Sequence, residues 1–459
     1  MSASDLVVRA PFGGRELARI SRPSLEEIET AVASAVRAFE ESRALPTFTR
    51  VAILRKVAAE LERRRDELAR TIAAEAGKPL KAARTEAERA SATFSAAAAA
   101  LEAQTGQMLP LDVNAASVSR WGVVKRVPLG PVLAITPFNF PLNLTSHKIA
   151  PAIAVGAPIV QKPASQTPLS ALALQEIVRA AGWPRDAYAV LPISGAAAEA
   201  LVLDPRLPVV SFTGSGAVGW RLKSLVPRKR VALELGGNAA VVVHSDADLD
   251  DAARRTASGA FSYAGQSCIS VQRALVHRPV LEAFRSKLLL FTAELVVGDP
   301  LDEKTDVGPM ITPEEATRAE AWVKEAVQGG AKALSGGTRD GDCLSPTILA
   351  DTAPSMKVEE QEVFAPVVTL TPYDDWDEAL RRVNDSKYGM QAGIFTRDLG
   401  RIQRAFDVLE VAAVLVNDVP TWRADRMPYG GVKESGSGRE GPAYAMEEFT
   451  EPRLLVIRA

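Results

Sequence analysis

Cysteine and histidine are scarce in this chain of 459 residues. It has two cysteines, Cys268 and Cys343, which are too few for a framework of disulfide bonds. Its three histidines, His147, His244 and His277, stand far apart, and none has a histidine or cysteine at the short spacing of a zinc-binding motif. These shortages exclude a disulfide-stabilised scaffold and argue against a metal site.

An excess of charge of one sign and long apolar segments are also missing. Lys and Arg number 54 and Asp and Glu number 56, so the net charge of −2 gives no field that attracts nucleic acid or an anionic membrane. No apolar run reaches the ~20 residues that span a bilayer. The opening residues, MSASDLVVRAPFGG, lack the basic and apolar segments of a signal peptide. We therefore expect a cytoplasmic protein without nucleic-acid or membrane partners.

The length exceeds what one hydrophobic core serves, so we expect two or three domains. Apolar residues at helical spacing predict helices over residues 23–42, 48–78 and about 80–104. Ser24 and Glu27 form a capping-box pattern at the start of the first helix. From residue 131, the short apolar segments PVLAIT, PIVQK, AYAVLP, PVVSFT and RVALEL alternate with helical segments. This alternation predicts a parallel sheet with helical crossovers, and a second such section runs from about 237 to 436.

The stretch FTGSGAVG, residues 212–219, has the glycine spacing of dinucleotide-binding turns. The glycine pattern runs from Gly214 to Gly219. Such a turn between strand and helix presents backbone N–H groups to a phosphate. The alternative is a tight turn that needs glycine only for its conformation. An acidic residue about 20 positions later usually holds the ribose, and Glu234 in LELGGN lies near that spacing. From this pattern alone, Glu234 either binds a ribose or takes part in chemistry.

Two polar breaks between predicted elements contain candidate catalytic residues. Cys268, in YAGQSCISVQR, lies between a helix and a strand, where loops often carry function. The alternative is a small buried hydrophobic residue. Asn139, in ITPFNFPLN, follows a strand and precedes a helix, and its amide could donate a hydrogen bond to an oxyanion. The alternative for Asn139 is an ordinary helix cap. Cys343 has no such surroundings and is assigned no role.

Seven motifs that occur in order resemble the signatures of the aldehyde dehydrogenase superfamily: ITPFNFPLN, KPASQTPLSALAL, FTGSGAVG, LELGGN, GQSC, EVFAPV and MPYGGVKESGSGREG. PFNFPLN and WRADRMPYGG look most like the branch of lactaldehyde and non-phosphorylating glyceraldehyde-3-phosphate dehydrogenases. The resemblance implies an α/β fold with two Rossmann-like open-sheet domains and a small β oligomerisation arm. The cofactor domain would span residues 1–110 and 130–236, the catalytic domain 237–436, and the arm with the C-terminal segment 111–129 and 437–459. A homodimer or homotetramer is implied.

The resemblance also implies a reaction, the oxidation of an aldehyde to a carboxylic acid with NAD(P). Cys268 as thiolate would attack the aldehyde carbon. The Asn139 amide and the Cys268 backbone N–H would stabilise the oxyanion. Loss of hydride from the thiohemiacetal leaves a thioester, and Glu234 would be the base that activates water to hydrolyse it. Glu234 is therefore expected to do chemistry rather than hold a ribose, and no metal is needed.

The same resemblance assigns cofactor contacts. Lys162 matches a lysine that contacts the adenosine ribose, and Glu362 matches a glutamate that binds a ribose. Ser215 matches a serine at the pyrophosphate, and Phe364 lies near the nicotinamide. The expected cofactor-binding residues are Lys162, Ser165, Gly214, Ser215, Gly219, Glu362, Phe364 and Phe138, the last standing where the commonest motif has tryptophan. NAD-preferring members often have a glutamate at the position of Ser165. A serine does not repel a 2′-phosphate, so NADP is favoured over NAD.

Substrate contacts are expected from Arg423, Arg426, Asn143 and Ser267. Ser267 stands where relatives that oxidise glyceraldehyde 3-phosphate have an arginine, which argues against that substrate. Arg423 and Arg426 lie on the loop that borders the aldehyde entrance and could pair with an anionic substrate group; the alternative is that both are surface charges. Two other functions remain open, a CoA-acylating enzyme and a catalytically silent protein of the same fold. Retained Glu234, Cys268 and Asn139 argue against them.

Overall fold

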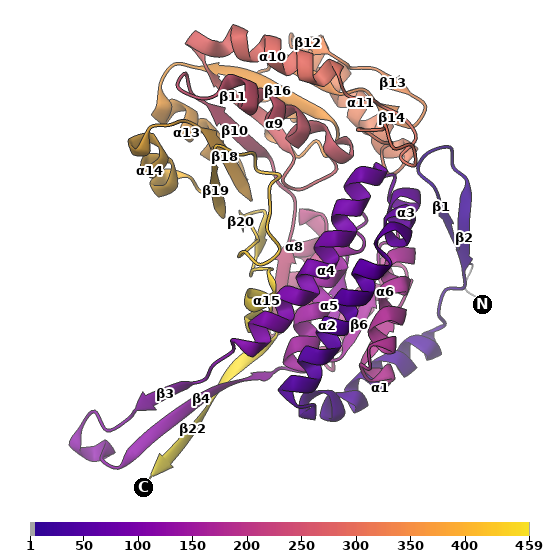
Figure 1. Cartoon of the computed structure of the whole chain (residues 1–459), viewed down its shortest axis with the longest axis vertical. Helices are drawn as coiled ribbons and strands as arrows, with labels where there is room; N and C mark the ends of the chain where they lie inside the picture. Colours follow the sequence, from indigo (N-terminus) through magenta and orange to yellow (C-terminus); the bar gives the residue numbers. More distant parts are fainter. Residues whose placement is uncertain (1–4, 459) are drawn as a thin grey trace.

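The computed structural model describes residues 5–458, and its largest sheets form two bodies with a narrow arm extending from one of them (Figure 1). The first body contains a six-stranded sheet in the order β21-β9-β8-β5-β6-β7. Its strands are β5 (Val132–Ile135), β6 (Ile159–Lys162), β7 (Tyr188–Val190), β8 (Val209–Thr213), β9 (Arg230–Glu234) and β21 (Gly436–Ser437). Strands β5 to β9 are parallel, and β21 joins the edge antiparallel to β9.

Helices cover both faces of this sheet because its strands bury side chains on both sides. In β5, Val132 and Ala134 pack on one core cluster, and Leu133 and Ile135 on the other. The helices of the first body are α1 (Leu25–Ala44), α2 (Thr47–Arg63), α3 (Arg65–Ala76), α4 (Leu80–Glu102), α5 (Asn143–Val155), α6 (Leu169–Ala180), α7 (Gly195–Leu203), α8 (Gly216–Leu225) and α15 (Pro442–Glu448). The capping box expected at Ser24 and Glu27 is confirmed at the start of α1.

The second body is a seven-stranded sheet in the order β12-β15-β16-β11-β10-β18-β19. All its neighbours are parallel except β12, which is antiparallel to β15. Its strands are β10 (Ala239–Val243), β11 (Val271–His277), β12 (Lys332–Ser335), β15 (Thr347–Ala350), β16 (Val367–Tyr373), β18 (Gln391–Phe395) and β19 (Ala413–Val416). Its helices are α9 (Leu249–Phe261), α10 (Leu281–Ala293), α11 (Pro313–Gln328), α12 (Lys357–Glu360), α13 (Trp376–Asn384) and α14 (Leu399–Val408).

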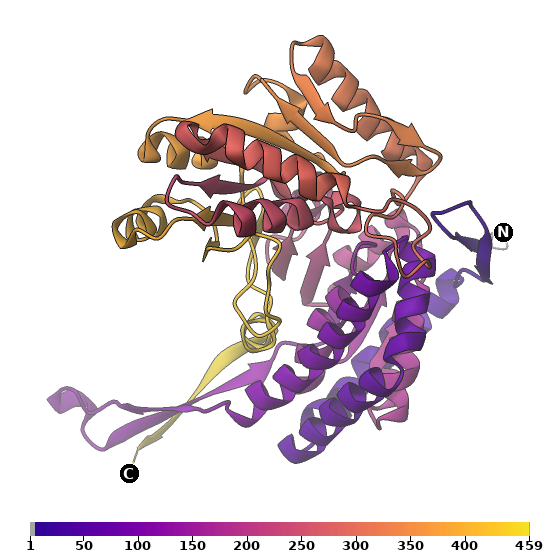
Figure 2. The same ribbon diagram turned by 45° about the horizontal axis from the view of Figure 1, so that its top comes forward.

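The arm is an antiparallel sheet in the order β22-β4-β3 that projects from the first body (Figure 2). It joins β3 (Gln107–Pro110) and β4 (Arg120–Pro128) to the C-terminal strand β22 (Thr450–Arg458). Between β21 and β22 the chain stays with the first body, where α15 packs against α4 and α5. The domain boundaries given above stay a prediction.

The helix expected over residues 48–78 is wrong in one respect, because it is two helices. Arg64 leaves helical geometry, with φ −95° and ψ 13°, and α3 begins at the next residue. The change of direction lets Leu61 of α2 and Leu68 of α3 enter the same core cluster. Apolar periodicity continues across the break, so it did not reveal the turn.

Short hairpins complete the described chain: β1 (Leu6–Arg9) with β2 (Glu16–Ile20), β13 (Arg339–Asp340) with β14 (Cys343–Leu344), and β17 (Tyr388–Gly389) with β20 (Val432–Lys433). The 3₁₀ helices are η1 (Ala115–Ser117), η2 (Arg185–Ala187), η3 (Ser262–Gly265) and η4 (Arg278–Val280). Within residues 5–458, no helix combines the length and apolarity required to cross a bilayer.

Candidate active site

The chain crosses from the first sheet to the second at Gly236 and Gly237, between β9 and β10. The backbone N–H of Gly237 donates a hydrogen bond to Glu362 Oε1 at 2.8 Å. A side chain at Gly236 would collide with the Glu362 carboxylate, and one at Gly237 would collide with the Cys268 carbonyl. Glycine is therefore required here, because the Glu362 carboxylate and the Cys268 backbone both approach the crossing closely.

Two cavities meet beside this crossing. The first cavity, of about 540 Å³, is lined by β5, β6 and the start of α8, together with Glu362 and Phe364. The second cavity, of about 440 Å³, is lined by α4, the loop before α5, Glu234 and the loop after β19. Cys268, Asn139, Leu144 and Thr213 line both cavities. A group bound in each would therefore reach the Cys268 thiol from two sides.

A turn with unusual backbone geometry places Cys268 at this junction. Tyr263, Ala264 and Gly265 all have positive φ angles, of 51°, 52° and 66°. A side chain at Gly265 would collide with the Ala365 carbonyl. Non-glycine residues in this region are costly, and their presence is typical of functional sites. Burial raises the pKa of Cys268 to about 12, although a hydrogen bond with Tyr429 opposes the increase.

Asn139 lies in the wall that both cavities share. Its amide nitrogen donates to the Gln266 carbonyl at 3.1 Å, and its Oδ1 has no hydrogen-bond partner among residues 5–458. The alternative that Asn139 caps α5 is wrong. That helix begins at Asn143, and the carboxylate of Glu86 accepts hydrogen bonds from the backbone N–H groups of Leu142 and Asn143. The amide of Asn139 is therefore free of a capping role.

Glu234 ends β9 and lines the second cavity rather than the first. Its side chain is buried, and neither carboxylate oxygen has a hydrogen-bond partner in the described chain. Burial raises the pKa of Glu234 well above its ordinary value, and the negative charge of Glu440 adds to the effect. A carboxyl group that shares a cavity with Cys268 and has a raised pKa suits a general base better than a ribose ligand.

All but one of the residues expected to bind the cofactor line the first cavity: Lys162, Ser165, Gly214, Ser215, Glu362, Phe364 and Phe138. The exception is Gly219, which does not line it. A side chain at Gly219 would collide with Leu235, so this glycine lets α8 pack closely on the end of β9. Burial lowers the pKa of Lys162, and Arg22 adds a smaller effect in the same direction. Burial raises the pKa of Glu362 to about 7.

The features of the first cavity fit a dinucleotide. Ser215 is the N-cap of helix α8 there, and its side chain makes no capping hydrogen bond, which leaves the first N–H groups of the helix available to a phosphate. The Thr213 hydroxyl in the same wall has no hydrogen-bond partner among the described residues. Phe138 and Phe364 meet edge to face, with ring centroids 6.0 Å apart, and form an aromatic wall. The cavity therefore offers phosphate donors, a cation and a flat apolar surface.

The expected substrate residues separate into two groups. Asn143, Ser267 and Arg423 line the second cavity, whereas Arg426 is exposed and does not line it. The alternative that Arg423 is a surface charge is wrong, because its side chain is only 4% exposed. Its guanidinium carbon lies 3.5 Å from the centroid of the Tyr429 ring.

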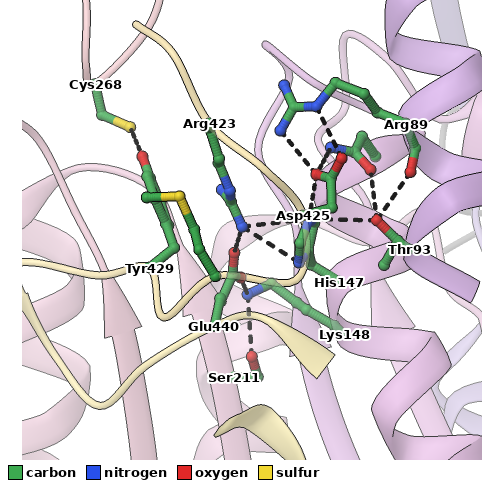
Figure 3. A network of polar contacts seen from close by, with 12 residues as sticks. Arg89, Thr93, His147, Lys148, Ser211, Cys268, Arg423, Asp425, Tyr429 and Glu440 are labelled. Carbon is green, nitrogen blue, oxygen red and sulfur yellow. Dashed lines mark hydrogen bonds and ion pairs between the residues drawn. The ribbon is translucent and has the colours of Figure 1, made fainter. Parts of the chain in front are cut away.

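A buried polar network supports the wall that contains Arg423 (Figure 3). The Arg423 guanidinium donates to Glu440 at 3.3 Å and lies 3.2 Å from the His147 ring nitrogens. His147 Nε2 is 2.9 Å from Asp425 Oδ1, and Asp425 also accepts two hydrogen bonds from Arg89, at 2.8 and 3.1 Å. Although burial opposes ionisation, the bonds from His147 and Arg89 hold the pKa of Asp425 well below its ordinary value.

Sequence reasoning missed most of this network. The sequence motifs contain Tyr429, Asp425 and Glu440 but indicate no role for them, and the sequence suggests for His147 only the possibility of a metal ligand. No local pattern connects His147 to a partner 278 residues away. The clearest available signal was the charged and aromatic content of the WRADRMPYGG and GREG segments. In the part of the chain that the structure describes, no group of three or more His, Cys, Asp or Glu side chains is arranged to hold a metal ion.

Comparisons with known proteins all find the same family, and each match covers nearly the whole length of this chain. A family model described as the aldehyde dehydrogenase family matches residues 1–455. A 3-sulfolactaldehyde dehydrogenase of Priestia megaterium is 44% identical over 457 residues, which cover 99% of this chain and 95% of that protein. The crystal structure of aldehyde dehydrogenase 21 from Physcomitrella patens, in complex with the reaction product succinate, matches with a TM-score of 0.97 and 42% identity over 99% of this chain and 95% of that one. Glyceraldehyde-3-phosphate dehydrogenase GapN from Methanocaldococcus jannaschii, complexed with NADP, matches with a TM-score of 0.96 and 38% identity over the full length of both chains.

Proposed function

Since the chain belongs to the aldehyde dehydrogenase family and oxidises an aldehyde to a carboxylic acid with NAD(P), we propose that its substrate is a short aldehyde with an anionic group at the other end. The observation that carries this proposal is the wall of the second cavity. There a buried arginine, Arg423, lies in the same cavity as the Cys268 thiol.

We propose the following roles for the residues around the thiol. The Cys268 thiolate attacks the aldehyde carbon, and the Asn139 amide, with the Cys268 backbone N–H, stabilises the oxyanion. The bound cofactor supplies the hydride acceptor. Glu234 removes a proton from water, which then hydrolyses the thioester on Cys268 and releases the acid. The missing hydrogen-bond partners of the Glu234 carboxylate in the described chain support this role, since they leave both oxygens available to water.

Two arginines in the second cavity support an anionic substrate. Arg89 comes from α4 and Arg423 from the loop after β19. Arg89 uses its Nε and one terminal nitrogen to bind Asp425. Arg423 Nε has no hydrogen-bond partner among residues 5–458. Guanidinium groups with free N–H groups in a desolvated wall bind carboxylate or sulfonate strongly and with defined geometry.

Four acidic residues lie in or behind the same wall, and two of them, Asp425 and Glu440, pair directly with Arg89 and Arg423. Glu86 is held in a buried ion pair with Lys78, and its other oxygen accepts the N–H groups before α5. Burial, followed by the charge of Glu440, raises the pKa of Glu234 and favours its neutral form. Because neither Asp425 nor Glu440 lines the second cavity, the Arg423 Nε–H, which has no partner in the described chain, is the donor that an anion would meet. The 3-sulfolactaldehyde dehydrogenase relative and the succinate-bound neighbour have names that point to the same class.

We propose that NADP is preferred and that NAD is also used. Ser165 lines the first cavity close to Lys162, at the position where a glutamate would repel a 2′-phosphate. Arg22 does not line the cavity, but it lies near enough to lower the pKa of Lys162 and adds positive charge behind this end. GapN of Methanocaldococcus jannaschii, complexed with NADP, supports the same preference.

The test of the substrate class compares 3-sulfolactaldehyde, succinate semialdehyde and neutral lactaldehyde with NADP, with and without CoA. We expect higher kcat/KM for the two anions and release of free acid without CoA. Equal kcat/KM for lactaldehyde would contradict the anionic class, and a requirement for CoA would show a CoA-acylating enzyme.

Arg423→Ala provides the matching structural test, with Arg426→Ala on the same loop as its control. Removing a hydrogen bond to a charged group costs about 1.5–3 kcal/mol, or roughly 10–100-fold in kcat/KM. We expect Arg423→Ala to lose this much for the anionic aldehydes beyond any loss for lactaldehyde. Arg426→Ala should change kcat/KM equally for all three aldehydes, because Arg426 is exposed and lies outside the second cavity.

We also propose a cytoplasmic homodimer or homotetramer that assembles through the arm. Three successive apolar side chains of β22, Leu454, Leu455 and Val456, are about half exposed. Exposed apolar groups of this kind on a projecting sheet are typical of subunit contacts. Light scattering after size exclusion should give two or four times the 48.9 kDa chain mass, and a monomer would contradict the proposal.

A further inference from the structure

The hydroxyl group of Tyr429 contacts the sulfur on which the reaction depends. Tyr429 is buried in the wall of the second cavity, and its oxygen lies 2.9 Å from Cys268 Sγ (Figure 3). The backbone of Tyr429 is fixed by two hydrogen bonds with the backbone of Glu440, at 3.1 and 2.6 Å. These bonds fix the backbone of Tyr429, and burial of its ring beneath Arg423 restrains the side chain that carries the hydroxyl group.

The surroundings of Cys268 otherwise disfavour a thiolate. Burial raises the pKa of Cys268 to about 12, and the carboxylates of Glu362 and Glu234 add to the increase. Two groups act in the opposite direction, the hydrogen bond from Tyr429 and the positive charge of Arg423. Because the thiolate is the nucleophile, the enzyme needs a donor that is directed at the sulfur itself. Among these groups, only Tyr429 makes a hydrogen bond to Sγ.

The hydroxyl group of Tyr429 keeps its proton and can therefore donate a hydrogen bond. Burial and the neighbouring Cys268 raise the pKa of Tyr429 well above its ordinary value, so its proton stays on the oxygen at neutral pH. The guanidinium of Arg423 lies over the ring, with its central carbon 3.5 Å from the centroid. A cation over the face of a phenol attracts electron density from the ring and makes the O–H a stronger donor.

We propose that Tyr429 is a further catalytic residue, whose hydroxyl group donates a hydrogen bond to the Cys268 thiolate and holds the sulfur at the junction of the two cavities. The tyrosine keeps its proton throughout, and the proton lost by the thiol passes to Glu234 or to water. When sulfur forms its bond to the aldehyde carbon, the negative charge moves to the former carbonyl oxygen. The bond from Tyr429 then weakens, and it strengthens again when hydrolysis of the thioester releases the thiolate.

The test uses Cys343→Ala protein, in which Cys268 is the single cysteine of the chain. The rate of alkylation by iodoacetamide is measured across pH, and the ultraviolet absorbance of the thiolate is followed over the same range. Adding Tyr429→Phe should move both profiles to higher pH and lower the alkylation rate at neutral pH by about 10–100-fold, the equivalent of one hydrogen bond to a charged group.

Tyr188→Phe is the matched control, because it removes a buried hydroxyl that donates to Gln161 at 2.6 Å in the core of the first body. It should lower Tm to a similar degree and leave both pH profiles in place. Profiles for Tyr429→Phe that coincide with those of Tyr188→Phe would overturn the proposal. If Tyr429→Phe does not fold, a fluorinated tyrosine at position 429, which is a stronger hydrogen-bond donor of nearly the same size, decides: profiles moved to lower pH support the proposal, and unmoved profiles overturn it.

Discussion

Glu234→Gln should separate the two halves of the reaction. The substitution keeps the size and shape of the side chain and removes its ability to take a proton. Neither oxygen of Glu234 has a hydrogen-bond partner in the described chain, so no such bond is lost. The new amide brings N–H donors into a site that is 3% exposed, at a cost of at most about 1–3 kcal/mol in folding free energy. The fold should therefore survive.

The expected kinetic effect is much larger than the effect on stability. A positioned general base contributes about 10²–10⁴-fold to a rate. Hydrolysis of the thioester should slow by this factor, whereas formation of the thioester should slow less. Stopped-flow measurement of reduced cofactor should then show a burst of about one equivalent per active site, followed by slow steady turnover.

The pH dependence provides a second measurement on the same variant. Glu234 acts as a base only when ionised, and burial, followed by the charge of Glu440, raises its pKa. Wild-type hydrolysis should therefore accelerate as pH rises through that raised pKa, and the Gln variant should lose this limb of the profile. Unchanged steady turnover, or a burst that slows as much as the steady phase, would refute the assignment of Glu234 as the base for hydrolysis.

Other substitutions test the remaining roles. Cys268→Ala should abolish NADP reduction in a steady-state assay because no thioester can form, while Cys343→Ala should keep near-wild-type turnover; activity in the first variant would end the covalent mechanism. Asn139→Ala should lower kcat by about 100-fold, the loss expected for one oxyanion donor, with little change in Tm; a change in Tm alone would indicate a structural role. Ser165→Glu should lower kcat/KM for NADP by at least about 10-fold relative to NAD, through like-charge repulsion; an unchanged ratio would show that Ser165 does not determine the choice.

Elements with a local signal could be predicted from the sequence, and elements without one could not. The capping box at Ser24 and Glu27 forms as expected, with hydrogen bonds of 2.7 and 3.2 Å, because all its atoms belong to four consecutive residues. The strand β10 was not predicted. Its residues AAVVV form a short continuous apolar run, which periodicity cannot distinguish from a buried helical segment. The break at Arg64 was missed because it depends on how two helices pack, not on local composition.

In the candidate active site, too, contacts between residues far apart in the sequence could not be predicted. Motifs located most of the cavity-lining residues, because each motif is one continuous segment beside a strand or helix end. They did not show that Cys268 contacts Tyr429, which is 161 residues away, or that Lys148 pairs with Glu440 across 292 residues. Such contacts depend on how the two sheets are placed against each other, and no single segment encodes that placement. Gly219 illustrates the reverse case, since it belongs to the glycine motif but packs against Leu235.

Arg423 and Arg426 show how this placement determines chemistry. They are three residues apart on one loop, and nothing in their local sequence distinguishes them. A buried charge costs several kcal/mol unless partners compensate it. Arg423 has Glu440, His147 and the face of Tyr429 around it, whereas Arg426 is left in solvent. The same guanidinium thus faces the proposed substrate anion and supports the tyrosine that contacts the nucleophile. An anion that binds Arg423 would reduce the positive charge over Tyr429, so recognition of the substrate and reactivity of the thiol are coupled through one side chain.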